Sequence, residues 1–184
     1  ITWQASDDTK VIFEGDFMRN NHPLDRGLTR FANQAGTPSR DTFWGDKDVG
    51  KLHNDNNMAQ LRFEHMLNDS WTLGGGFQWL DGTLQGNAIE ANGPGSLGAD
   101  GRTLQRNFNY RKLEWTDKDY QLNLTGHFST GGLDHTLLTG VEYEDYDYQS
   151  IIQRSSAAAG TYPIDIFNPV YGQARPPLTR TPTH

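Results

Sequence analysis

The feature that most constrains this chain is a pair of alternating stretches between Tyr120 and Tyr148, joined by a glycine-rich turn. From 120 to 128 the apolar side chains share one parity and the polar side chains hold the other. Successive side chains of a β-strand point to opposite faces, so this pattern predicts a strand with one apolar and one polar face. Ser129-Thr130-Gly131-Gly132 then favours a tight turn, and residues 133–148 alternate again as a returning strand.

The same alternation recurs along the chain and predicts about six strands. Short turns are expected at 6–9, 68–70 and 129–134, and long loops at 20–55, 81–105 and 149–184. No stretch of useful length has the helical period, so the expected fold is an all-β antiparallel meander. In a meander, alternating short and long connections place all short turns at one end and all long loops at the other. The segment 112–118 breaks the parity of its neighbours and predicts a bulge or an irregular stretch.

Composition narrows the class of protein. The 184 residues are 34% hydrophobic with a mean hydropathy of −0.75 and no run of 18 apolar residues, which excludes a transmembrane helix but not a transmembrane barrel. The net charge of −7 argues against nucleic acid as a partner. Without cysteine, neither disulfides nor thiolate metal sites are possible. The start inside an apolar stretch predicts a mature or internal segment.

Two fold classes fit these observations. Strands of about ten alternating residues with short turns at one end are typical of an outer-membrane β-barrel, and aromatic residues near the strand ends match its interface girdles. The alternative is a soluble all-β fold, such as a carbohydrate-binding module whose tryptophans stack on sugars. Those tryptophans would be Trp3, Trp44, Trp71, Trp79 and Trp115.

Several short patterns are interpreted as structural. Residues 93–98 match G-x-G-x-x-G but lack the flanking strand and helix of a dinucleotide site, and no nucleophile or zinc motif occurs, so no enzyme is predicted. The acidic run 142–148 lacks the glycine and spacing of a calcium loop. His127 and His135 flank a short turn and are interpreted as structural. No metal site and no cofactor is predicted.

Three stretches carry a family resemblance. Residues 128–143, FSTGGLDHTLLTGVEY, resemble the F-x-T-G-x-x-x-H-x-L-L-x-G-x-x-Y hairpin of TonB-dependent siderophore receptors. Residues 61–73, LRFEHMLNDSWTL, resemble the E-H-x-F-N-D-x-W-x-L hairpin of the same family, with Leu67 in place of Phe. Residues 165–172, DIFNPVYG, resemble a D-x-F-N-P-x-Y motif of the extracellular loops, and Gly27-Leu28-Thr29 resembles a G-L-P with Thr for Pro.

The resemblance implies a segment of a 22-stranded transmembrane β-barrel in the Gram-negative outer membrane. It implies a monomeric receptor for a ferric siderophore, energised by the TonB complex through an N-terminal plug domain that is absent from this chain. The barrel would contact the lipid bilayer and lipopolysaccharide. On this interpretation the short turns are periplasmic and the long loops extracellular. Leu122, Leu124, Leu137 and Val141 would face lipid, and Gln121, Asn123 and Glu142 would face the lumen.

The resemblance also places cargo recognition in the long loops. A siderophore already holds its iron, so the receptor supplies aromatic surface and a few hydrogen-bonding groups rather than metal ligands. The expected ligand-binding residues are His22, Phe31, Phe43, Trp44, Tyr162, Phe167 and Tyr171.

Overall fold

The computed structural model describes residues 1–91, 93, 95–155 and 162–180. It divides into two compact units. The sheet unit comprises Ile1–Met18, Asp55–Gly82 and Glu114–Tyr148, and the loop unit comprises Arg19–Asn54, Thr83–Leu113 and Gln149–His184.

Strands make up all the regular structure of the described residues. Their bounds are β1 Thr2–Ser6, β2 Thr9–His22, β3 Leu52–Asn68, β4 Trp71–Ala91, β5 Thr103–Leu104, β6 Arg106–Thr130, β7 Leu133–Ser155, β8 Ile164–Asp165 and β9 Leu178–Arg180. One sheet has the order β1-β2-β3-β4-β6-β7-β9, and β5 pairs with β8 in a second. The predicted all-β antiparallel meander is therefore confirmed. The described part of the chain contains no helix long and apolar enough to cross a membrane.

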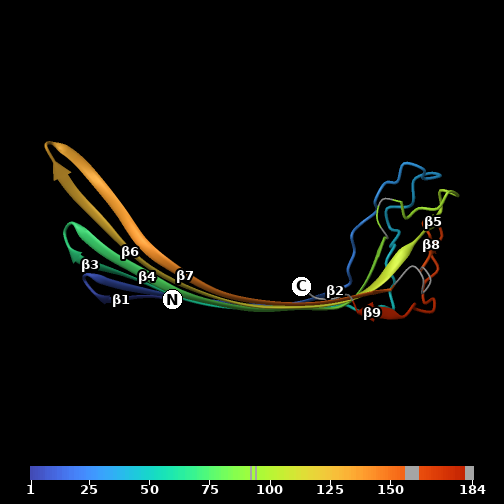
Figure 1. The fold of residues 1–184 in the computed structure, drawn as a ribbon, viewed down its shortest axis with the longest axis horizontal. Helices are drawn as coiled ribbons and strands as arrows, with labels where there is room; N and C mark the ends of the chain where they lie inside the picture. The colour runs from blue at the N-terminus through green and yellow to red at the C-terminus, as the bar shows by residue number, and fades with distance from the viewer. Residues whose placement is uncertain (92, 94, 156–161, 181–184) are drawn as a thin grey trace. The chain divides into compact units, whose positions relative to one another are not determined.

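Three tight turns lie at the same end of the sheet unit (Figure 1). They fall at 7–8, 69–70 and 131–132, within the three short connections predicted from the sequence. Gly131 and Gly132 have φ angles of 60° and 83°. A two-residue hairpin turn with positive φ at both positions matches the twist of its flanking strands, and glycine adopts that conformation without steric cost.

The period of two separates the side chains of the sheet unit into two faces. The rings of Phe77 and Tyr120 lie 4.9 Å apart between centroids, and those of Tyr120 and Tyr143 lie 6.1 Å apart, so these aromatics share one face. Gln121, Asn123 and Glu142 line a concave surface on the other. Val141 is 72% exposed, so the apolar face of this hairpin is uncovered.

The two histidines beside the last hairpin turn have the structural contacts expected of them. His127 Nδ1 and Thr136 Oγ1 lie 3.1 Å apart across the β6–β7 pair. The ring of His135 lies 5.2 Å from that of Phe128, which in turn stacks with Trp71 at 6.4 Å. These contacts join neighbouring strands close to the turn.

The irregular stretch predicted near 112–118 is not found, because β6 runs unbroken from Arg106 to Thr130. A bulge within this strand stays a prediction. Trp115 is an apolar residue at a position where the alternation predicts a polar one. Its indole ring packs over Gly82 of β4. A β-carbon at Gly82 would collide with that ring. The missing side chain of the glycine therefore makes room for the tryptophan.

The predicted loops 20–55, 81–105 and 149–184 were each too long. β2 continues to His22, β3 begins at Leu52, β4 continues to Ala91 and β7 continues to Ser155. The segment 81–91 contains Gly82, Gly86 and Asn87, residue types that individually disfavour strands, but pairing with neighbours overrides that preference. Gly86, at φ 146°, lies where a β-carbon would meet the carbonyl oxygen of Lys51 at 2.5 Å, so the missing side chain permits close approach.

The loop unit has a hydrophobic core of its own. One cluster joins residues of the β2–β3 connection to the β5 and β8 region, and consists of Phe31, Trp44, Leu97, Leu104, Ile164 and Ile166. A second cluster consists of Val49, Ile89, Phe108 and Tyr162. The long connections therefore pack into a folded layer, and the two residues of β8 pair with β5 inside it.

Candidate functional site

Arg106 at the start of β6 holds three segments of the loop unit together. Its side chain is fully buried, at 0% exposure. Nε donates to the Tyr162 carbonyl oxygen at 2.9 Å, and Nη1 donates to the carbonyl oxygens of Trp44 at 2.8 Å and Gly45 at 2.6 Å. The guanidinium carbon also lies 4.6 Å from the centroid of the Tyr162 ring. A planar group with several donors can satisfy carbonyls from separate segments in this way.

Tyr162 and Asp46 form a buried hydrogen-bonded pair beside Arg106. The Tyr162 hydroxyl donates to Asp46 Oδ2 at 2.6 Å. Burial, together with this bond to a carboxylate, raises the pKa of Tyr162 to about 12. Burial acts to raise the pKa of Asp46, but hydrogen bonds from Tyr162 and from the backbone N–H groups of Asp48 and Gly172 lower it below its usual value. Asp46 is therefore a carboxylate that ties three segments together.

The D-x-F-N-P-x-Y-G segment, 165–172, forms a hydrogen-bonded turn on this core. Asp165 Oδ1 accepts from the backbone N–H groups of Phe167 at 2.8 Å and Asn168 at 3.2 Å. Arg102 donates to Asp165 Oδ2 at 2.7 Å, and this bond holds the pKa of Asp165 below its usual value. The Tyr171 hydroxyl donates to the carbonyl oxygen of Phe43 at 2.8 Å. These hydrogen bonds hold the segment 165–172 against Arg102 and against Phe43 of the β2–β3 connection.

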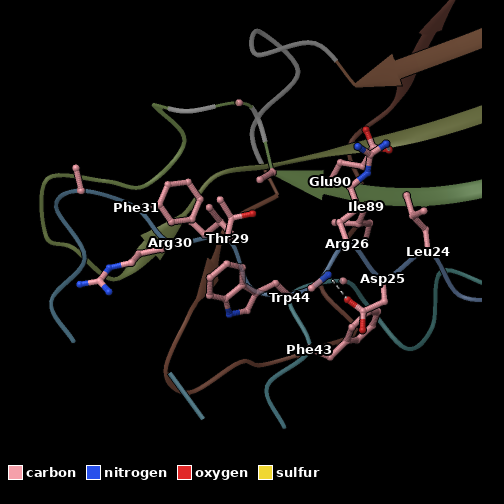
Figure 2. A pocket seen from close by; sticks show the side chains of 16 residues that line it. Leu24, Asp25, Arg26, Thr29, Arg30, Phe31, Phe43, Trp44, Ile89 and Glu90 are labelled. Carbon is pink, nitrogen blue, oxygen red and sulfur yellow. Dashed lines mark hydrogen bonds and ion pairs between the residues drawn. The ribbon is translucent and has the colours of Figure 1, made fainter. Parts of the chain in front are cut away.

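A cavity of about 550 Å³ opens within the loop unit and is named here the Glu90 cavity (Figure 2). Its volume is within the range of small-molecule sites. An apolar and aromatic wall faces charged side chains from the β2–β3 connection and the end of β4. The labelled lining residues are Leu24, Asp25, Arg26, Thr29, Arg30, Phe31, Phe43, Trp44, Ile89 and Glu90.

Glu90 is the centre of an ion-pair cluster at this cavity. Its Oε1 accepts from Arg26 Nη2 at 2.8 Å and from Arg111 Nη2 at 2.7 Å. Its Oε2 accepts from Asn109 Nδ2 at 3.1 Å. The Glu90 side chain is 15% exposed and that of Arg26 is 62% exposed, so Arg26 is the solvent-facing member of the cluster.

A second cavity, of about 690 Å³, shares the segment 29–32 and Trp44 with the first and is named here the Arg40 cavity. Among the described residues that line it, the ionisable ones are Arg30 and Arg40. Phe31 and Trp44, whose ring centroids lie 6.0 Å apart, contribute to the walls of both cavities.

The seven residues predicted from the sequence are found in different environments. Phe31, Phe43 and Trp44 line the Glu90 cavity, and Phe31 and Trp44 also line the Arg40 cavity. The other four, His22, Tyr162, Phe167 and Tyr171, line neither cavity. Tyr162 is 1% exposed and lies in the core. Ligand contact by any of the seven stays a prediction.

Sequence reasoning missed the charged half of these cavities. Arg26, Arg30, Arg40 and Glu90 were not selected, since each lies within a stretch expected to be a loop. Arg26 and Glu90 are 64 residues apart, and an ion pair at that separation leaves no periodic signal. The available signal was the Asp25-Arg26-Gly27 step directly before the G-L-T segment of the family resemblance.

Tyr162 provides a pH test of this core. In an unfolded chain a tyrosine ionises near pH 10, whereas its folded pKa is about 12. The neutral phenol therefore stabilises the folded loop unit fully below pH 10, and this contribution is lost as the pH rises through 12. The tyrosinate absorbance of the wild type minus that of Tyr162→Phe should show a step near pH 12. A step near pH 10 would contradict the buried pair.

The chain belongs to the family of TonB-dependent receptor β-barrels. The family profile described as "TonB dependent receptor-like, beta-barrel" matches residues 2–183. Proteins of this family are outer-membrane receptors and transporters rather than enzymes. The family predicted from the three sequence motifs is thus confirmed.

Individual relatives share this segment. The chain is 41% identical over 180 residues to the metal-pseudopaline receptor CntO of Pseudomonas aeruginosa strain UCBPP-PA14, covering 98% of this chain and 25% of that protein. It is 27% identical over 183 residues to the ferrioxamine B receptor of Salmonella typhimurium strain SL1344, covering 94% of this chain and 24% of that protein. The chain therefore spans about a quarter of the length of these curated relatives.

A solved structure shares the fold. The ferric preacinetobactin receptor BauA of Acinetobacter baumannii superposes with a TM-score of 0.78 at 18% identity, covering all of this chain and 27% of that protein. At this identity the likeness describes the fold alone.

Proposed function

We propose that this chain is a wall segment, with its outer loops, of an outer-membrane receptor that imports a ferric siderophore or a related metal chelate. The observation that carries the proposal is the Glu90 cavity, a concave site of about 550 Å³ in the loop unit of a TonB-dependent receptor barrel. It combines aromatic walls with a few charged groups, as small-molecule sites do. The relatives named as receptors for metal-pseudopaline and ferrioxamine B support this class of cargo.

The proposal includes the parts of the receptor that lie outside this chain. The relatives are about four times as long as the matched segment, which leaves room for the rest of a 22-stranded barrel and for a plug domain. TonB would energise transport through that plug, and the barrel would be a monomer in the Gram-negative outer membrane. The receptor would need no resident cofactor, because the chelate brings its own metal ligands.

The carbohydrate-binding alternative is not favoured. It requires tryptophan rings free to stack on sugars. Trp71 stacks on Phe128 within the sheet unit, and Trp115 packs against Gly82, so these two rings already have protein partners.

The direct test is uptake of an iron-labelled siderophore by Gram-negative cells that depend on the full-length receptor. Uptake is expected only when the receptor and TonB are both present. A receptor with an inactivated TonB-binding segment is the matched control. Uptake at equal rates with and without TonB would contradict the energised mechanism, and a receptor that binds sugars but no metal chelate would contradict the proposed class.

The two faces of the sheet unit make a separate prediction about membrane position. Val141 and Glu142 are neighbours on β7 whose side chains point to opposite faces. In the full receptor reconstituted in lipid, a spin label on cysteine at 141 should be relaxed by lipid-soluble oxygen. The matched label at 142 should be relaxed by a water-soluble nickel complex. Equal exposure of both labels to water would contradict a lipid-facing surface.

A further inference from the structure

The Arg40 cavity differs in charge from the rest of the chain. The sequence carries a net charge of −7, yet the ionisable residues found in the described lining of this cavity are two arginines. Neither Arg30 nor Arg40 forms an ion pair with another described residue. No carboxylate of the described residues therefore neutralises either arginine.

The Glu90 cavity has a different electrostatic arrangement. Arg26 and Arg111 are already paired with Glu90, so the positive charge there is largely compensated within the protein. In Figure 2 the Arg30 side chain extends away from Arg26 and Glu90. Arg30 lines both cavities, whereas Arg40 lines only the Arg40 cavity.

The remaining lining of the Arg40 cavity suits the organic part of a small ligand. Phe31 and Trp44 supply apolar surface, and Thr29, Gln34 and Thr37 supply neutral hydrogen-bonding groups. A guanidinium matches the planar, two-oxygen geometry of a carboxylate, and such charge-assisted pairs are about twice as strong as neutral hydrogen bonds.

We propose that the Arg40 cavity selects a negatively charged metal chelate that carries free or metal-bound carboxylates, with Arg30 and Arg40 as its anion contacts. Phe31 and Trp44 form the apolar wall against which the chelate backbone lies. This inference rests on the proposed function and deepens it by naming the class of cargo. A neutral hydroxamate complex offers no group that uses the two arginines, so it is the disfavoured class.

The test measures binding of two probes to the purified full-length receptor by calorimetry. Ferric citrate is the anionic carboxylate probe and ferric tris(acetohydroxamate) is the neutral probe. Arg30→Gln and Arg40→Gln should each weaken ferric citrate binding about tenfold, since each removes one charge-assisted contact. The double variant should lose about a hundredfold if the contacts are independent. Arg30→Lys and Arg40→Lys, which retain the charge, should recover part of the loss.

Arg154→Gln is the matched control, because Arg154 is an exposed arginine of the same unit that lines neither cavity. It should bind ferric citrate as the wild type does. Preference of the wild type for the neutral probe, or ferric citrate affinity unchanged in the double variant, would overturn the inference while leaving a chelate receptor intact. Binding of no metal chelate by the wild type would overturn the proposed function and the inference with it.

Discussion

Replacement of Arg106 by methionine is expected to cost the loop unit about 3–5 kcal/mol, the largest effect of any single substitution considered. Methionine fills part of the volume but offers no donor. The carbonyl oxygens of Tyr162, Trp44 and Gly45 would then be buried without their partner. The three carbonyls come from two segments far apart in the sequence, 44–45 and 162, so loss of these bonds should loosen the whole unit.

Hydrogen exchange of the full receptor would measure this effect. Amides of the loop unit should lose protection, while those of the sheet unit, such as the β6–β7 hairpin, should keep theirs, since the three carbonyls bound by Arg106 belong to the loop unit. Arg154→Met, at an exposed arginine of the same unit, is the control and should change stability by at most about 0.5 kcal/mol. Unchanged protection near 44–46 and 162–166 in Arg106→Met would contradict the role assigned to this side chain.

Trp44→Ala is expected to have the second largest effect, about 3–5 kcal/mol of local stability, together with loss of chelate binding. The indole is 7% exposed, packs against Phe31 and donates from Nε1 to the Ile166 carbonyl oxygen at 3.3 Å. It also lines both cavities. Removing it would empty part of the core and part of the binding wall at once.

Trp44→Phe separates these two contributions. Phenylalanine keeps most of the apolar surface but loses one ring of the indole and the bond to Ile166, the bond costing about 1 kcal/mol. The variant should remain folded by hydrogen exchange and bind a metal chelate more weakly than wild type. Trp3→Ala, at a 63% exposed tryptophan of β1, is the control and should leave binding unchanged. Full chelate affinity in Trp44→Ala would remove Trp44 from the site.

The hairpin at 120–148 was predictable because the residues that determine its strands and turn are close together in the sequence. Alternation assigns each side chain to a face, and two glycines specify the turn. The strand end at Ala91 was not predictable in the same way. Gly82 and Gly86 look like loop residues in sequence, and their real role appears only beside Trp115 and Lys51. When a glycine is needed for close packing between strands, the sequence around it does not reveal this role.

The candidate site, too, was predictable from the sequence only where the signal is local. Phe31, Phe43 and Trp44 were predictable because large aromatics are conspicuous in a polar loop, and they do line the Glu90 cavity. The same criterion selected Tyr162, which is a core residue bonded to Asp46. Aromatic type alone does not distinguish a ring that faces a cavity from one that closes a core. The ion pairs of Glu90 depend on contacts across tens of residues, which only the fold brings together.

The central claim is that the loop unit, with its two cavities, holds the cargo while the sheet unit is scaffold. Hydrogen exchange of the full-length receptor with and without a bound ferric siderophore tests it most directly. We predict that the chelate protects amides in 24–32, 43–45 and 89–91, which line the cavities, and leaves the β6–β7 hairpin amides at 120–148 unchanged. Protection confined to segments outside the loop unit, with no change at the cavities, would contradict the claim.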